Sequence, residues 1–159
     1  MSDRFAFFHK LIATSFGVGY MPYGPGTMGA LFGLLVWMLM FYTLDYCSLM
    51  IVTACLIVVF TLIGTWSASV AERFWGEDPS KVVMDETVGT WIALLAVPAG
   101  GHWSYCVAAF VLFRFFDIVK PLGVRRMERF KGGIGIMADD ILAGVYSAIV
   151  LLFFKMLIE

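Results

Sequence analysis

Two neighbouring aspartates, Asp139 and Asp140, stand between three glycines and an apolar run in the stretch GGIGIMADDILAG, residues 132–144. Two carboxylates at an apolar boundary repel each other and lose hydration, so they need a compensating positive charge. A hard divalent cation supplies one, and magnesium usually binds a few carboxylates together with water and substrate phosphate. Because neighbours on a helix point about 100° apart, we expect one aspartate to face the site and the other to cap the helix. Close approach of the backbone to a ligand is expected at Gly132, Gly133 and Gly135.

A second acidic pair, Asp85 and Glu86, lies where the polar loop 71–87 meets the next apolar segment. If a helix begins there, acids in its first turn are stabilised by the partial positive charge of the helix terminus. Capping of this kind would account for one of the two acids. A metal-binding role would account for both, and the sequence leaves the two interpretations open.

A third set of polar residues occurs in the stretch FRFFDIVKP, residues 113–121. Arg114, Asp117 and Lys120 are three residues apart, so on a helix they would share one face. Pro121 would end or bend that helix. Arg114 follows a long apolar run, and an ionisable residue at membrane depth usually faces a bundle interior or a polar cavity. The alternative is an arginine that extends toward the membrane surface and pairs with Asp117.

A fourth candidate is the stretch PYGPGTMG, residues 22–29. Gly24, Gly26 and Thr27 offer backbone N–H groups and a hydroxyl just before a predicted helix. Such an arrangement can hold an anion such as phosphate. A plain turn into the first membrane span fits the same residues.

The composition indicates an integral membrane protein. Hydrophobic residues make up 61% of the 159 residues and charged residues 14%, and the mean hydropathy is +0.89. Average soluble domains are roughly half apolar and about a quarter charged. The length predicts one domain, residues 1–159. A net charge of −1 gives no support for nucleic acid as a partner.

Five apolar segments predict an all-α membrane bundle of about four or five helices. They are residues 28–44, 47–66, 88–100, 103–116 and 141–158. The segment 88–100 is short for a full span, so it would have to tilt, extend into its flanks or break. Residues 1–15 mix charged and aromatic side chains and predict a short helix at the membrane surface. Residues 16–29 contain too much glycine and proline for a regular helix.

Basic residues set the orientation of the bundle through the positive-inside rule. They concentrate before the first span, in the loop 71–87 and in a second polar loop, residues 117–140. The turns near Asp45 and at 100–102 carry no lysine or arginine. Hairpin pairing of the segments therefore places all three basic regions, and the polar candidates with them, on the cytoplasmic side.

A carboxylate-rich metal site with lysine and arginine nearby, at a membrane surface, suits a phosphorylated lipid head group. A cation polarises the phosphoryl group and positive side chains hold its oxygens. A cysteine-nucleophile phosphatase needs Cys-x5-Arg, and no cysteine has an arginine six positions on. Only two histidines are present, His9 and His102, and His102 is predicted at the opposite face. Metal-activated hydrolysis of a phosphomonoester remains, with a carboxylate nucleophile still open.

Two other classes of protein use similar residues. A membrane phospho-alcohol transferase also needs clustered aspartates and magnesium, but its D-G-x-x-A-R pattern is missing. A non-catalytic small transporter or scaffold would carry ionisable residues along a path through the spans. Here they gather at one face, which favours an enzyme.

The chain resembles the phosphatidylglycerophosphatase A family of bacterial inner-membrane enzymes. The matching stretches are GYMPYGPGTMG (19–29), DPSKVVMDETVGTWIALLAVP (78–98) and FRFFDIVKPLGVRRMERFKGGIGIMADDILAG (113–144). The resemblance covers nearly the whole chain. It implies an all-helical, multi-pass fold with a cytoplasm-facing site and magnesium-dependent removal of the terminal phosphate from phosphatidylglycerophosphate. The products would be phosphatidylglycerol and phosphate. The reaction would belong to phospholipid metabolism, either in phosphatidylglycerol biosynthesis or in lipid degradation.

The family's acidic motifs fall on Asp85-Glu86 and Asp139-Asp140, where the sequence shows no departure from the family pattern, and Asp117 and Lys120 lie in the block between. Together with the residue patterns described above, these matches lead us to expect the following roles. The metal ligands would be Asp85, Glu86, Asp139 and Asp140. The residues expected to take part in the reaction are Asp117, Asp140 and Lys120, with Asp117 either a further ligand or the group that orients water. The substrate phosphate would be held by Gly26, Thr27, Arg114 and Lys120. The partners implied are the lipid bilayer and a phosphorylated glycerolipid substrate.

Overall fold

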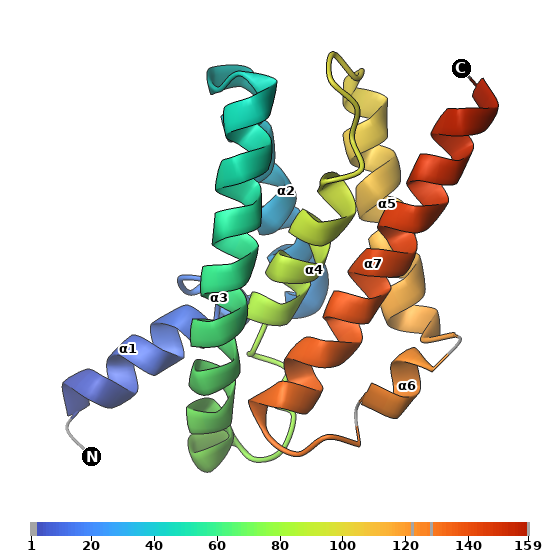
Figure 1. The fold of residues 1–159 in the computed structure, drawn as a ribbon. Helices are drawn as coiled ribbons and strands as arrows, with labels where there is room; N and C mark the ends of the chain where they lie inside the picture. Colours follow the sequence, from blue (N-terminus) through green and yellow to red (C-terminus); the bar gives the residue numbers. More distant parts are fainter. Residues whose placement is uncertain (1–2, 122, 128, 159) are drawn as a thin grey trace.

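The computed structural model describes residues 3–121, 123–127 and 129–158, and these form an all-helical bundle (Figure 1). The predicted fold class is therefore confirmed. The helices are α1 (Asp3–Ala13), the 3-10 turn η1 (Val18–Tyr20), α2 (Pro25–Thr43), α3 (Tyr46–Trp75), α4 (Met84–Leu94), α5 (Trp103–Val119), α6 (Val124–Met127) and α7 (Gly133–Ile158). Each of the five predicted apolar segments contributes to one helix: α2, α3, α4, α5 or α7.

In the described part of the chain, three helices are long and apolar enough to cross a membrane. They are Pro25–Thr43, Tyr46–Trp75 and, within α7, Gly133–Leu157. Their outer faces carry large exposed apolar side chains such as Leu39, Leu62 and Phe153. Without a bilayer such faces would meet water at a high free-energy cost, so they suit contact with lipid chains.

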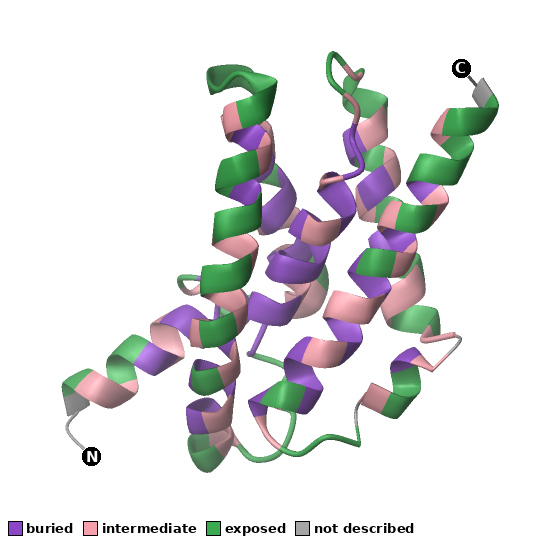
Figure 2. Ribbon diagram, viewed as in Figure 1, coloured by how far each residue is buried: buried purple, intermediate pink, exposed green. Residues whose placement is uncertain are grey.

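The short helix α4 lies at the centre of the bundle (Figure 2). It packs against α2, α3, α5 and α7, and its residues are buried except Glu86 and Ile92, which are half-buried. With 11 residues it is about 16 Å long, far less than the roughly 30 Å of a bilayer core. The predicted segment 88–100 is short because it is enclosed by other helices and does not need to span lipid.

Helices extend into segments that the sequence assigned to loops. α2 begins at Pro25, so the expectation of no regular helix in 16–29 was wrong for its last residues. Proline suits a first helical turn because its missing N–H would have no partner there. α3 runs to Trp75 and α5 to Val119, while α7 starts at Gly133, and these helices shorten both polar loops.

The connections divide between the two ends of the bundle (Figure 1). The loop 76–83, α6 and the start of α7 lie at one end, which we call the polar end. The turns at 44–45 and 95–102 lie at the other end. The N-terminal helix α1 packs against α3 near the polar end, where His9 Nδ1 lies 3.0 Å from Ser67 Oγ. The hairpin pairing expected from the basic residues is the arrangement observed.

Candidate active site

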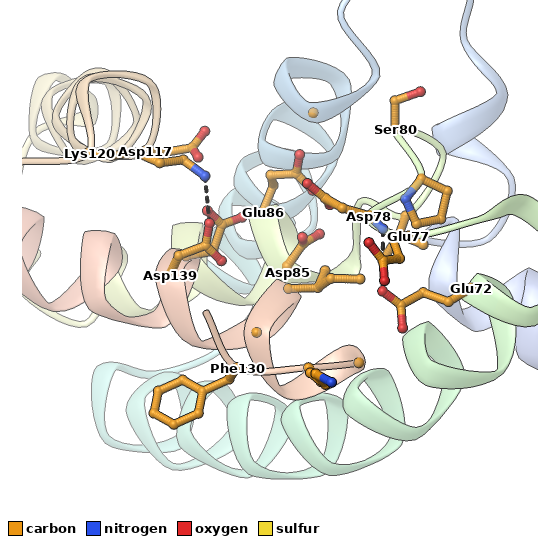
Figure 3. A pocket seen from close by; sticks show the side chains of 18 of the residues that line it. Glu72, Glu77, Asp78, Ser80, Asp85, Glu86, Asp117, Lys120, Phe130 and Asp139 are labelled. Atoms are coloured by element: carbon orange, nitrogen blue, oxygen red, sulfur yellow. Dashed lines mark hydrogen bonds and ion pairs between the residues drawn. The ribbon is translucent and has the colours of Figure 1, made fainter. Parts of the chain in front are cut away.

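A cavity of about 740 Å³ lies at the polar end, among the first turns of α2, α4 and α7 and the last turns of α3 and α5 (Figure 3). Acidic side chains dominate its lining. The acids are Glu72, Glu77, Asp78, Asp85, Glu86, Asp117, Asp139 and Asp140, and the bases are Lys120, Arg129 and Lys131. A hollow lined mostly by one sign of charge concentrates the opposite sign, so this cavity favours a cation.

Asp85, Glu86 and Asp140 form what we call the inner acid cluster, in which one carboxylate oxygen from each lies within 4.8 Å of the others. The contact between α4 and α7 explains why they meet. A Cβ atom at Gly144 would lie only 2.5 Å from the carbonyl oxygen of Gly89, so the two helices touch at these glycines. Residues four apart share a helix face. Asp85 lies four residues before Gly89, and Asp140 lies four residues before Gly144. Because the two helices run in the same direction (Figure 1), the two carboxylates face each other one helical turn closer to the N-terminal ends of α4 and α7.

Several buried carboxylate oxygens around the cavity have no hydrogen-bond partner in the part of the chain that the structure describes. Among the described residues they are Asp85 Oδ1, Glu86 Oε2 and Asp139 Oδ1. A buried unpaired carboxylate is costly, and coordination of a cation removes that cost. Oxygen-only donors are those that hard cations such as magnesium prefer. The residues present therefore fit a cation site. Of the four predicted ligands, Asp85, Glu86 and Asp140 converge in a possible metal-binding cluster, and Asp139 is not part of it.

Burial also changes how the acids of α4, which lies outside the three long spans, titrate. Burial raises the pKa of Asp85 well above its usual range, and the neighbouring Glu86 carboxylate adds to the shift. Burial raises the pKa of Glu86 as well, although a hydrogen bond with Asp85 opposes it. Both directions express the cost of holding negative charge away from water. A bound cation would offset that cost.

Two further acids of the cavity are paired with basic side chains. Lys120 Nζ donates to Asp139 Oδ2 at 2.6 Å, as Figure 3 shows, and Arg114 Nη1 forms an ion pair with Asp117 Oδ2. Arg114 and Asp117 lie on α5 as predicted. The helix ends at Val119, however, and Lys120 follows in a left-handed conformation with φ 50°. Lys120 therefore reaches the cavity from the helix cap, and the expectation that it would share the helical face was wrong.

The start of α2 forms one wall of the cavity. Gly26 lines it, and a Cβ atom there would collide with Glu86 Oε1 and lie 3.6 Å from Arg114 Nη1. A side chain at this position would displace the Glu86 carboxylate, which packs directly against the backbone of α2. Thr27 is exposed, and neither Thr27 nor Arg114 is among the lining residues in the described part of the chain. Arg114 acts on the cavity through its pair with Asp117.

For the stretch 132–144, the expectation of a capping aspartate was wrong, and the expected approach of glycines to a ligand is not met at Gly133. Because α7 begins at Gly133, Asp139 and Asp140 lie in its second turn, and neither caps the helix. Both are buried and line the cavity. Gly133 serves helix packing, since a Cβ atom there would collide with the carbonyl oxygen of Thr65 in α3, whereas Gly132 and Gly135 do line the cavity.

Several residues that line the outer part of the cavity were not predicted as site residues. Glu72, Glu77 and Asp78, which we call the rim acids, come from the end of α3 and the loop after it. Arg129 and Lys131 come from the segment before α7. The sequence signal that could have indicated them is their position in the polar loops 71–87 and 117–140, which were both predicted on the same side of the membrane. The extension of α3 to Trp75, which the apolar run did not predict, brings Glu72 to the cavity.

Comparison with known proteins identifies related chains along nearly the whole length. The sequence model of the family described as Phosphatidylglycerophosphatase A matches residues 11–155. A Bacteroides thetaiotaomicron protein, provisionally named as a phosphatidylinositol-3-phosphatase, is 55% identical over 149 residues, 93% of this chain and 94% of the relative. Phosphatidylglycerophosphatase A of Escherichia coli K12 is 40% identical over 90% of this chain and 81% of its own. The Haemophilus influenzae protein of the same name is 38% identical over 88% and 84%.

No solved structure matches this chain. The family match covers most of the sequence, including α2, α3, α4 and α5, α7 as far as residue 155, and every residue of the inner acid cluster. The expectation of an enzyme that hydrolyses a phosphoric monoester agrees with this match. The chain belongs to the phosphatidylglycerophosphatase A family.

Proposed function

We propose that this chain hydrolyses the terminal phosphomonoester of phosphatidylglycerophosphate with magnesium as its cofactor, yielding phosphatidylglycerol and inorganic phosphate for phospholipid biosynthesis. The observation that carries the proposal is the inner acid cluster. It combines three converging carboxylates, two of them with unpartnered buried oxygens, in a cavity at the polar end of helices long enough to span a membrane. The family membership supports the same reaction.

Asp85, Glu86 and Asp140 would hold the cation, and the unpartnered Oδ1 of Asp139 is a further donor. When bound, magnesium would offset much of the negative charge of these carboxylates and would draw electron density from a phosphate and from water. Donors that are all carboxylate oxygens favour magnesium over zinc, whose typical protein sites include cysteine or histidine.

The other residues of the cavity would bind phosphate and direct water. Lys120, which already donates to Asp139, would bind phosphate oxygens, beside the backbone of Gly26. Asp117, held by Arg114, would orient the attacking water and accept its proton, or add a cation ligand. Attack of the water oxygen on phosphorus breaks the phosphorus–oxygen bond to glycerol, whose oxygen leaves with a proton.

The cavity would face the cytoplasm of a bacterium, with the chain as a single multi-pass domain in the inner membrane. Exposed basic residues gather at the polar end, including Arg73, Arg125, Arg126 and Lys131. The turns at the other end carry none. The positive-inside rule assigns the basic end to the cytoplasm.

Phosphatidylinositol 3-phosphate is a second candidate substrate, favoured by the name of the Bacteroides relative. It shares its reactive group with phosphatidylglycerophosphate. In both lipids a phosphomonoester sits on a polyol that is joined to the lipid by a phosphodiester. One site chemistry would therefore serve either lipid.

The test is phosphate release by the purified protein in detergent, with magnesium or with EDTA. The substrates are phosphatidylglycerophosphate, phosphatidylinositol 3-phosphate and phosphatidic acid. Asp140→Asn should lower kcat/KM by at least about 100-fold, since it removes a charged group that acts on the reacting phosphate. Asp45→Asn is the matched control and should stay within about twofold, because Asp45 caps α3 at the opposite end.

Each result has a definite meaning. Release that requires magnesium and disappears in Asp140→Asn supports both the reaction and the site. An Asp140→Asn protein as active as the wild type would overturn the site. A folded wild-type protein that releases phosphate from none of the lipids would overturn the function and favour a transferase or transporter.

A further inference from the structure

A second hollow lies beside the acidic cavity, and its lining is basic. It has a volume of about 610 Å³ and is lined by Gly123, Arg125, Arg126 and Arg129. Arg129 also lines the acidic cavity, so the two hollows adjoin at this side chain. We call the second one the arginine hollow. The proposed reaction uses none of its residues.

The arginines are carried by a short turn that is fixed to the bundle. Val124, the first residue of α6, is fully buried, and α6 packs against α7. The backbone N–H of Val124 donates to Pro121 O at 3.1 Å, and that of Arg126 donates to Gly123 O at 2.9 Å. Val124 thus anchors α6 on the helix that supplies Asp139 and Asp140, while the arginine side chains remain exposed.

Charge is distributed unevenly around the mouth of the acidic cavity. The rim acids lie at the end of α3 and in the loop after it, whereas the arginines lie on and after α6. In Figure 1 the end of α3 and α6 stand on opposite sides of the start of α7. A negative group beyond the inner acid cluster is therefore repelled on the α3 side and attracted on the α6 side.

We propose that the arginine hollow binds the phosphodiester of the lipid while the terminal phosphomonoester occupies the acidic cavity. The inference rests on the proposed function and deepens it, because it assigns the residues that select the substrate class. Guanidinium groups form bidentate, charge-assisted hydrogen bonds with phosphate oxygens. Lipids that carry both phosphates engage both hollows, whereas phosphatidic acid, with its single monoester, engages only one.

Anionic head groups of the surrounding bilayer offer the same phosphodiester chemistry. They would bind the arginines without any link to turnover. The assay therefore uses micelles of a neutral detergent, in which the substrate or inhibitor is the only phospholipid. A parallel series in vesicles that contain phosphatidylserine adds the bulk anionic surface.

The experiment compares the wild type, the double variant Arg125→Gln/Arg126→Gln and the single variant Arg126→Gln. Arg73→Gln is the matched control, because Arg73 is an exposed arginine near the end of α3 that lines neither hollow. Three quantities are measured: KM for short-chain phosphatidylglycerophosphate, the inhibition constant of short-chain phosphatidylglycerol, which has only the diester, and that of inorganic phosphate.

The double variant should raise KM and the phosphatidylglycerol inhibition constant by about tenfold, with a smaller rise in the single variant. Its kcat and its inhibition constant for inorganic phosphate should stay within about twofold, because the acidic cavity is unaltered. Arg73→Gln should leave all three quantities within the same range. A purely structural role of α6 would not separate the two inhibitors.

Three results would overturn the inference. They are unchanged constants in the double variant, an equal rise for both inhibitors, and an effect confined to the phosphatidylserine vesicles. A wild type that releases no phosphate from phosphatidylglycerophosphate would overturn the proposed function itself. An active wild type with unaltered variants would overturn only the arginine hollow.

Discussion

The inner acid cluster and the rim acids belong to one cavity and have the same side-chain chemistry, yet their surroundings differ. Asp85 and Asp140 are buried, and oxygens of Asp85 and Glu86 lack partners among the described residues. Glu77 and Asp78 are exposed, and Glu72 Oε1 accepts the backbone N–H of Asp78 at 3.3 Å. The exposed carboxylates of Glu77 and Asp78 are open to solvent, and Glu72 has a backbone partner. The inner cluster is left with a free-energy cost that a cation would remove.

The difference teaches that the number of carboxylates alone does not decide where a cation would bind. An exposed acid keeps its hydration and gains little from a cation, whereas a buried acid has lost its hydration and gains much. The sharpest tests therefore pair a change in the inner cluster with the equivalent change at the rim.

The largest effect is expected from Asp85→Asn. The amide keeps the shape of the side chain but removes one of the three charges that face the proposed cation. Phosphate release from phosphatidylglycerophosphate should fall by at least about 100-fold in kcat/KM. Retention of more than a tenth of wild-type activity at saturating magnesium would contradict a role for Asp85 in the centre.

A smaller loss of activity is expected from Gly26→Ala, which removes no charged group. The added methyl group would collide with Glu86 Oε1, so the carboxylate must move away from its place in the cluster. Displacement of a reacting group by about 1 Å can cost up to about 100-fold, and we expect a loss of about 10- to 100-fold in kcat/KM. The exposed neighbour offers a control, and Thr27→Ala should stay within about twofold. Equal losses in the two variants would show that the whole turn, and not Gly26, matters.

The unfolding temperature with and without magnesium tests cation binding by the inner acid cluster without an activity assay. Magnesium at 100 times its dissociation constant stabilises the folded state by about 2.7 kcal/mol. For a chain of this size that corresponds to a rise of about 5–10 °C in the unfolding temperature in detergent. Without magnesium, Glu86→Gln should unfold at or above the wild-type temperature, because like-charge repulsion is relieved. With magnesium, it should lose most of the increase in unfolding temperature that the wild type shows. A full magnesium-induced rise in Glu86→Gln would place the cation elsewhere.

The sequence was sufficient for the five long apolar segments of the bundle, though not for the ends of their helices, and for the acidic pairs that the structure places around the cavity. Five apolar segments predicted the bundle, and paired carboxylates at apolar boundaries pointed to Asp85, Glu86, Asp139 and Asp140. Both signals are local: hydrophobic runs form buried or lipid-facing helices, and adjacent like charges at an apolar edge need a partner.

The remaining features depend on contacts between distant segments. The approach of Gly89 to Gly144, which sets Asp85 opposite Asp140, joins two helices that are far apart in the chain. Similarly, α3 continues past its apolar run because small residues such as Ala68 and Ala71 are buried at the polar end. Lys120 leaves the predicted helical face because α5 ends just before Pro121. No single stretch of sequence contains these contacts.

The smallest effect is expected at the rim, from Glu77→Gln. Glu77 is exposed, so its charge is screened by water and salt, and its loss should change kcat/KM by no more than about twofold. The measurement is the same phosphate-release assay, at low and at physiological salt, beside Asp85→Asn. The small effect should shrink further at the higher salt, since screening acts on exposed charges more than on buried ones. If Glu77→Gln instead lost as much activity as Asp85→Asn at both salt concentrations, burial would not be what separates the two sets of acids, and the metal centre would have to extend to the rim.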